Sequence, residues 1–143
     1  MDYAISEKYK QMSEAVIDAV PELHWILEAG VRIVYERSFK EKKRSGKLVL
    51  GECKKVPDDW AFYCPYDFRI IVYEANTEGL TENQLKVLLW HEHLHIGLRE
   101  TDGELVYRVT PHDIEEFDPI IRRFGPHWAN FGADIPDITE GGG

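Results

Sequence analysis

The central helix of this chain is predicted by TENQLKVLLWHEHLHIG, residues 81–97. Its first four residues match the Thr-x-x-Gln pattern of a capping box, in which the first and fourth positions satisfy backbone N–H groups that the first helical turn leaves without partners. Gly97 is typical of the position just past a helix, because glycine readily adopts the left-handed backbone conformation found there. The sequence therefore predicts a helix over residues 82–96.

A His-Glu-x-x-His motif is expected midway along this helix. His91 and His95 differ by about 40° around the helix axis and by one turn of rise, so both imidazoles project from one face and can bind one Zn²⁺. Glu92 lies about 100° from His91, where its carboxylate flanks the ion and can take a proton from water bound to it. The motif thus predicts a zinc site with Glu92 as the catalytic base. The alternative is an ordinary amphipathic helix whose histidines only pack.

A catalytic zinc site requires a third protein ligand and one open position. His112 is the leading candidate, because it follows a predicted strand and Pro111, where the chain can turn back over the helix. His93, between the two other histidines, faces the opposite side of the helix and is expected to be structural. Zinc also accepts carboxylates, so the competing third ligands are Asp102, Glu104, Asp113, Glu115 and Glu116.

The remaining segments predict an α+β fold, in which a small mixed or antiparallel sheet packs against helices. Apolar residues three or four positions apart predict helices, and alternating or β-branched runs predict strands. Residues 40–47, KEKKRSGK, are expected to form the basic, solvated tip of a hairpin. The other expected elements are helices at 5–19, 21–30 and 114–124 and strands at 31–35, 48–53, 68–73 and 104–109.

Composition limits the classes of protein that remain. The 143 residues suit a single domain of the usual ~150 residues, expected at 1–128 with a flexible tail at 129–143. Lys and Arg number 17 against 26 Asp and Glu, and the net charge of −9 argues against nucleic acid as a partner. With no apolar run long enough to span a membrane and no secretory signal, a cytoplasmic location is expected. Cys53 and Cys64 form no Cys-x-x-Cys pair and are expected to be reduced, partly buried thiols.

The two histidine segments, 91–95 and 111–117, resemble the putative phage metallopeptidase family of small zincins. Stretches 51–68 and 81–86 are similar to the same family, and the likeness extends over residues 3–128. Segment 111–117 also resembles the third-ligand segments of SprT-like and WLM metalloproteases. The resemblance implies a zincin-like fold, a peptide or protein substrate, a location in the cytosol of a bacterium or a phage-infected host, and a zinc ion held by His91, His95 and His112.

These features favour a zinc-dependent metallopeptidase whose substrate lies along an exposed edge strand, expected at residues 68–73. Two alternatives remain open. One is a non-enzymatic zinc-binding protein with which a phage interacts with its host. The other is a DNA-associated, SprT-like protease whose basic residues 40–47 contact DNA, against which the net negative charge argues.

Overall fold

The structure, a computed structural model, describes residues 2–111, 120, 123, 128–129 and 135–139. Its helices are α1 (Glu7–Ala19), α2 (His24–Glu28), α3 (Asp58–Ala61), α4 (Glu74–Thr77) and α5 (Glu82–Leu94), with a 3₁₀ helix η1 (Pro21–Leu23) before α2. Its strands are β1 (Tyr3–Ile5), β2 (Ile33–Ser38), β3 (Lys43–Arg44), β4 (Lys47–Leu48), β5 (Gly51–Lys55), β6 (Phe68–Tyr73), β7 (Ile96–Thr101) and β8 (Glu104–Val109). This mixture of helices and sheets confirms the predicted α+β class. Most of the helix expected at 114–124 and most of the expected tail lie outside the described residues.

The main sheet has the strand order β1-β2-β6-β5. β2 and β6 pair in parallel, whereas β1 pairs with β2 and β5 with β6 in antiparallel, so the sheet is mixed. β6 therefore lies inside the sheet and β5 at its edge, and the prediction that residues 68–73 form an edge strand is wrong. The physical reason is that β6, with the sequence FRIIVY, is buried at every position except Arg69. A strand that is apolar toward both faces suits the interior of a sheet.

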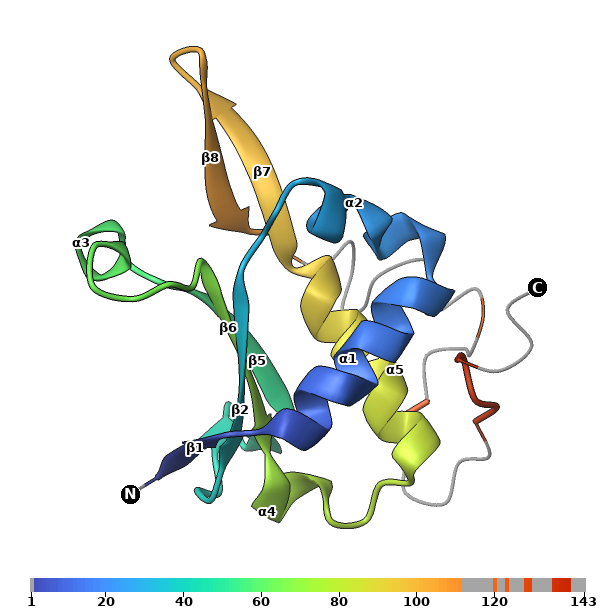
Figure 1. Cartoon of the computed structure of the whole chain (residues 1–143). Coiled ribbons are helices and arrows are strands. Elements are labelled where there is room, and N and C mark those ends of the chain that lie inside the picture. Colours follow the sequence, from blue (N-terminus) through green and yellow to red (C-terminus); the bar gives the residue numbers. More distant parts are fainter. Residues whose placement is uncertain (1, 112–119, 121–122, 124–127, 130–134, 140–143) are drawn as a thin grey trace.

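Helices α1 and α5 cover one face of this sheet (Figure 1). Their apolar sides meet the sheet in one hydrophobic core, and burial of such surface is the main favourable contribution to folding. Members of this core include Tyr9, Val16, Ile17, Phe68, Ile70, Val72, Leu85, Leu88 and Leu89. As a result α5 is held between α1 and the edge strand β5. None of the helices in the described part of the chain has the length and apolar character needed to cross a membrane.

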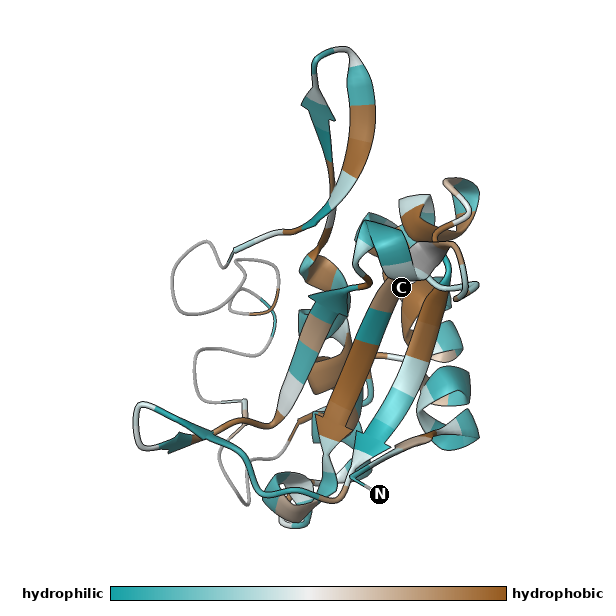
Figure 2. Ribbon diagram, turned by 90° about the vertical axis from the view of Figure 1, so that its left-hand side faces the viewer, coloured by the Kyte–Doolittle hydropathy of each residue, from teal (hydrophilic) through white to brown (hydrophobic). Residues whose placement is uncertain are grey.

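The opposite face of the sheet is turned to the viewer in Figure 2, with the apolar β6 between the more polar β2 and β5. The predicted basic hairpin is present beside this sheet, as β3 paired with β4. Ser45 and Gly46 connect the two strands with φ values of 53° and 77°. Positive φ at both central residues is what a two-residue type I′ turn requires. A short hairpin with the predicted basic tip is therefore present. The strands expected on either side of it, at 31–35 and 48–53, do not pair with each other, because β6 lies between β2 and β5, and the strand expected at 48–53 begins later, as β5.

Helix α5 ends earlier than predicted. Its last helical residue is Leu94, and His95 occupies the C-cap position. Residues from Ile96 onward form β7, which pairs along its whole length with β8 through a turn at Asp102-Gly103. Backbone pairing with β8, in which Val109 lies opposite Ile96 and Arg108 opposite Gly97, thus ends the helix at Leu94. The His-Glu-x-x-His motif consequently lies at the C-terminal end of α5 rather than midway along it.

Residues 135–139 pack against α5. The side chains of Ile135 and Ile138 are buried, and Asn83 Nδ2 donates to the Ile135 carbonyl at 3.1 Å. Lys86 Nζ donates to Asp137 Oδ2 at 2.7 Å. The domain boundary at residue 128 stays a prediction, but these five residues beyond it are in contact with the core.

The Lys86–Asp137 ion pair makes stability depend on pH in the acid range. Burial alone would raise the pKa of Asp137, but hydrogen bonds from Lys86 and Thr139 outweigh it and lower the pKa to about 2. Because the folded pKa is below the unfolded value of ~3.9, the pair stabilises the protein above that pH and loses its effect as pH falls toward 2. Asp137→Asn is therefore expected to cost about 1 kcal/mol of unfolding free energy at pH 7, after allowing for solvent screening. Urea unfolding at pH 7, 5 and 3 checks this, and a difference from wild type that does not shrink toward pH 3 would contradict it.

Candidate metal centre

The His-Glu-x-x-His motif is positioned by a helix that is fixed at both ends. At the N-terminus, Thr81 Oγ1 accepts from the Gln84 N–H at 3.1 Å and Gln84 Oε1 accepts from the Thr81 N–H at 2.8 Å, which confirms the predicted capping box. At the C-terminus, the Thr110 N–H donates to the His95 carbonyl at 2.5 Å. The rotation of α5, and with it the direction of the motif, is therefore set by contacts on both sides of the helix.

The two predicted histidine ligands converge. His91 Nε2 and His95 Nε2 are 3.3 Å apart, and both side chains are largely shielded from solvent. His95 Nδ1 lies 2.6 Å from the Thr110 carbonyl oxygen. A carbonyl oxygen only accepts, so Nδ1 carries the proton and the lone pair of the neutral ring is on Nε2, which is the nitrogen that faces His91.

Glu92 lies beside both rings. Its Oε2 is 3.8 Å from His91 Nε2, its Oε1 is 4.0 Å from His95 Nε2, and the residue is 3% exposed. The ligand atoms of the three residues lie within 4.8 Å of one another. Gly51 of β5 allows this arrangement, because a Cβ at that position would stand 3.3 Å from Glu92 Oε2 and 3.1 Å from the Ile71 carbonyl oxygen. The edge strand therefore approaches α5 closely at the point where the carboxylate is placed.

His93 is buried on the opposite side of α5, as predicted. Its Nδ1 donates to the Leu89 carbonyl at 2.6 Å, and its Nε2 accepts from the Tyr35 hydroxyl at 2.7 Å. Burial lowers the pKa of His93 to about 4, so the ring is neutral. The hydrogen bond joins β2 to the last turn of α5 and thereby supports the two neighbouring histidines.

Removing that hydrogen bond is expected to weaken both the fold and the site. Tyr35→Phe leaves the buried His93 Nε2 without the hydroxyl that it accepts from, at a cost of about 1–3 kcal/mol in unfolding free energy. Tyr63→Phe is the matched control, because Tyr63 is exposed and such changes usually alter stability by less than ~0.5 kcal/mol. Denaturant unfolding of the chelator-treated protein measures the effect. Equal stability of the two variants would show that the Tyr35–His93 bond contributes nothing.

The cluster opens into a pocket of about 260 Å³. Besides the three motif residues, it is lined by Arg44, Gly51, Glu52, Cys53 and Val109. Cys53 and Cys64 are free and partly buried, as expected, and burial followed by the nearby Glu92 charge raises the pKa of the Cys53 thiol. The thiol beside the cluster therefore stays protonated.

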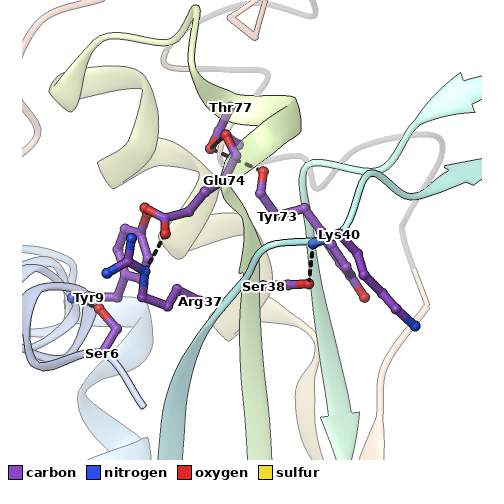
Figure 3. Close-up of polar contacts among 8 residues, drawn as sticks. All are labelled: Ser6, Tyr9, Arg37, Ser38, Lys40, Tyr73, Glu74 and Thr77. Carbon is purple, nitrogen blue, oxygen red and sulfur yellow. Dashed lines mark hydrogen bonds and ion pairs between the residues drawn. The ribbon is translucent and has the colours of Figure 1, made fainter. Parts of the chain in front are cut away.

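A larger pocket of about 480 Å³ lies away from this cluster, between α1, β2 and α4. Figure 3 shows the contacts there: Tyr9 donates to Glu74 Oε2 at 3.1 Å, Arg37 also pairs with Glu74, and Thr77 donates to the Tyr73 carbonyl. These polar groups already satisfy one another within the chain. The smaller pocket at the histidines, where three potential metal ligands converge, is therefore the better candidate site.

The predicted third ligand is not among the described residues, since His112, Asp113, Glu115 and Glu116 all lie outside them. Asp102 and Glu104 are described, and they occupy the far end of the β7–β8 hairpin. Five residues of extended chain separate that end from Ile96, about 17 Å along the strand. The structure thus brings together His91, Glu92 and His95 and places these two carboxylates away from them.

Sequence reasoning missed three contributors to this site, namely Gly51, Arg44 and the carbonyl of Thr110. A glycine at the start of a strand is a signal for close approach of another element, so Gly51 could have been found. Arg44 and Thr110 reach the site only through the two hairpins, and no local pattern in the sequence reveals that proximity.

Comparison with known proteins gives a family match over most of the chain. The family model described as "putative phage metallopeptidase" matches residues 1–136, which extends two residues before and eight residues beyond the expected range of 3–128. Comparison with curated proteins and with solved structures found no match. The likeness of segment 111–117 to SprT-like and WLM metalloproteases stays a prediction.

Proposed function

Since the chain belongs to the phage metallopeptidase family, we propose that it is a zinc-dependent metallopeptidase, with Glu92 as general base and with His91, His95 and His112 as metal ligands. The family description supports a metal-dependent protease. The choice of zinc and the roles of the residues are proposed from the arrangement of His91, Glu92 and His95 at the end of α5. The expected setting is the cytosol of a bacterium or a phage-infected host.

The observation that carries the proposal is the 3.3 Å separation of the His91 and His95 Nε2 atoms. Two nitrogens bound to one zinc ion in tetrahedral geometry at ~2.0–2.1 Å are themselves about 3.3–3.4 Å apart. The Nδ1–H···O bond from His95 to Thr110 supplies the partner that metal-binding histidines usually have, because it holds the ring and leaves Nε2 as the ligand atom. The spacing of these two nitrogens therefore suits a shared zinc ion.

His112 is supported by the path of the chain. The β7–β8 hairpin returns the backbone to α5, so that Thr110 is hydrogen-bonded to His95 through both its N–H and its carbonyl. Residue 112 follows two positions later, which is a reach of about 7 Å from the Thr110 Cα. A ligand from this segment can therefore approach the histidine pair.

The chemistry follows from the position of Glu92. Zinc, when bound here, lowers the pKa of water toward ~7 and polarises the carbonyl of the scissile peptide bond. Glu92 stands beside both histidines in a site largely closed to solvent, so its carboxylate can take the water proton and deliver it to the departing amine. Gly51 has no side chain, and this leaves room for the Glu92 carboxylate at this position.

The substrate would lie along β5. This strand pairs with β6 on one side, and its other side borders the pocket with His91, Glu92 and His95. An extended peptide can add to such an edge by main-chain hydrogen bonds. β5 thus takes the role that the sequence assigned to residues 68–73.

The test measures zinc binding and peptide hydrolysis in separate experiments. Zinc binding has to be measured directly, because a 3.3 Å contact also suits an N–H···N hydrogen bond between two metal-free imidazoles. Calorimetric titration of chelator-treated protein with zinc is expected to give one site per chain. A mixture of internally quenched peptides is expected to be cleaved, cleavage is expected to stop with a chelator, and added zinc is expected to restore it. Zinc binding without cleavage of any peptide would favour the non-enzymatic zinc-binding alternative, and absence of zinc binding would overturn the proposal.

A further inference from the structure

A basic side chain shares the pocket of the histidine cluster. Arg44, from β3 in the basic hairpin, lines the pocket together with His91, Glu92 and His95, and its side chain is 68% exposed. The hairpin residues 40–47 contain five Lys or Arg and one Glu. The chain as a whole has a net charge of −9, so this positive region beside the pocket is opposite in sign to the rest of the molecule.

The positive charge is only partly compensated by Glu52. This buried carboxylate of β5 forms an ion pair with Lys42, and both Arg44 Nη2 and Lys54 Nζ lie 3.6 Å from it. Burial opposes ionisation of Glu52, but the hydrogen bond and charge of Lys42 and the charge of Lys54 lower its pKa overall. Glu52 is therefore a carboxylate, and three cations around one anion leave an excess of two positive charges in this cluster.

The pleat of β5 determines which side chains of a bound peptide meet these cations. Successive residues of a strand point to opposite faces, so Glu52 and Lys54 lie on one face of β5, and Gly51 and Cys53 lie on the face toward α5. A peptide strand added to β5 continues the same pleat. Every second side chain of the peptide therefore lies on the face of Glu52 and Lys54, where Arg44 is placed.

We infer that this cluster selects substrates with Asp or Glu at the alternate positions that face it, so that the peptidase acts on acidic peptide segments. The inference rests on the proposed function for the location of the substrate beside β5. The Asp or Glu carboxylate of the bound peptide would form ion pairs with Arg44 and Lys54, whose charges Glu52 compensates only in part. A peptide fits this site better than a nucleic acid, because the repulsion of a net charge of −9 acts along the whole length of a phosphate backbone.

The experiment compares three sets of internally quenched peptides that differ only in carrying Asp, Asn or Lys at each position around the cleaved bond. We expect kcat/KM to be about fivefold higher for the Asp peptide than for the Asn peptide at one or more alternate positions. This ratio corresponds to ~1 kcal/mol for a partly exposed charge pair. About 0.5 M salt is expected to bring the ratio close to one, because it screens exposed charges. Arg44→Glu is expected to reverse the order, so that Lys exceeds Asp. Lys10→Glu, an exposed reversal on α1 outside the pocket, is the matched control and is expected to keep the order.

A binding measurement separates failure of this inference from failure of the proposed function. The zinc-loaded Glu92→Gln protein is titrated with fluorescein-labelled peptides containing Asp or Asn and with a single-stranded DNA oligonucleotide of equal charge. Tighter binding of the Asp peptide that Arg44→Glu abolishes supports the inference even if no peptide is cleaved. Equal binding of the Asp and Asn peptides, equal cleavage of the two, or tighter binding of the DNA would each overturn it.

Discussion

Glu92→Gln is expected to slow peptide hydrolysis by about 10²–10⁴-fold, the usual contribution of a general base, while zinc affinity stays within a few-fold of wild type. An amide has the size of the carboxylate but cannot take a proton from water at neutral pH. Glu92 is 3% exposed and flanks both histidines at 3.8–4.0 Å, so the substitution changes the proton-accepting group and leaves the two imidazoles in place. Steady-state cleavage of a quenched peptide and calorimetric zinc titration measure the two effects.

Glu28→Gln, an exposed change on α2, removes the same charge far along the chain from the motif and is expected to leave turnover unchanged. Wild-type turnover in Glu92→Gln would reject Glu92 as the base. Loss of zinc from that variant would instead assign its carboxylate as a metal ligand, since the site would then depend on it for binding. The pair of variants therefore separates proton transfer from coordination.

His95→Ala is expected to weaken zinc binding by at least about 10²-fold, because loss even of a residue that only supports a ligand typically costs 10–100-fold. The substitution removes the Nε2 atom that lies 3.3 Å from His91 and also the Nδ1–H bond to Thr110. His24→Ala is the matched control, because His24 is exposed on α2 and its Nε2 lies 3.0 Å from the Asp18 carbonyl oxygen. Zinc titration measures the loss, and thermal unfolding in chelator establishes that both variants are folded.

The same titration applied to His112→Ala tests the third ligand. A loss of affinity comparable to that of His95→Ala is expected. Undiminished zinc binding in His112→Ala would move the assignment to Asp113, Glu115 or Glu116, since Asp102 and Glu104 lie at the distant end of the β7–β8 hairpin. Undiminished binding in His95→Ala would reject the metal centre itself.

Local patterns in the sequence predicted the features of α5 that depend on neighbouring residues. The capping box at Thr81 and Gln84 involves residues three apart, and the backbone hydrogen bonds of the α-helix that follows join residues four apart. The convergence of His91 and His95 follows from the period of the helix alone. Both features are independent of where the rest of the chain lies.

Features that depend on pairing between distant segments were not predicted correctly. The sequence predicts the end of α5 at Ile96, because nothing local to Ile96 indicates that it pairs with Val109. The sequence predicts β6 as a strand but at an edge of the sheet, although apolar residues on both faces are typical of an interior strand. The sequence predicts Ile5 in the first helix, whereas Ile5 lies in β1, where it pairs with Glu36 of β2, and the helix begins after the Ser6 N-cap. The order of strands in a sheet is decided by long-range contacts that single-segment patterns do not contain.

The β7–β8 hairpin has a practical consequence for labelling this protein. Its turn at Asp102-Gly103 projects from the body of the molecule (Figure 1). The full length of β7 separates this turn from His95. A fluorophore or affinity tag inserted between these two residues would extend the turn without altering the pairing of Ile96 with Val109. Such a label offers a handle for immobilising or imaging the protein while its histidine pair stays intact.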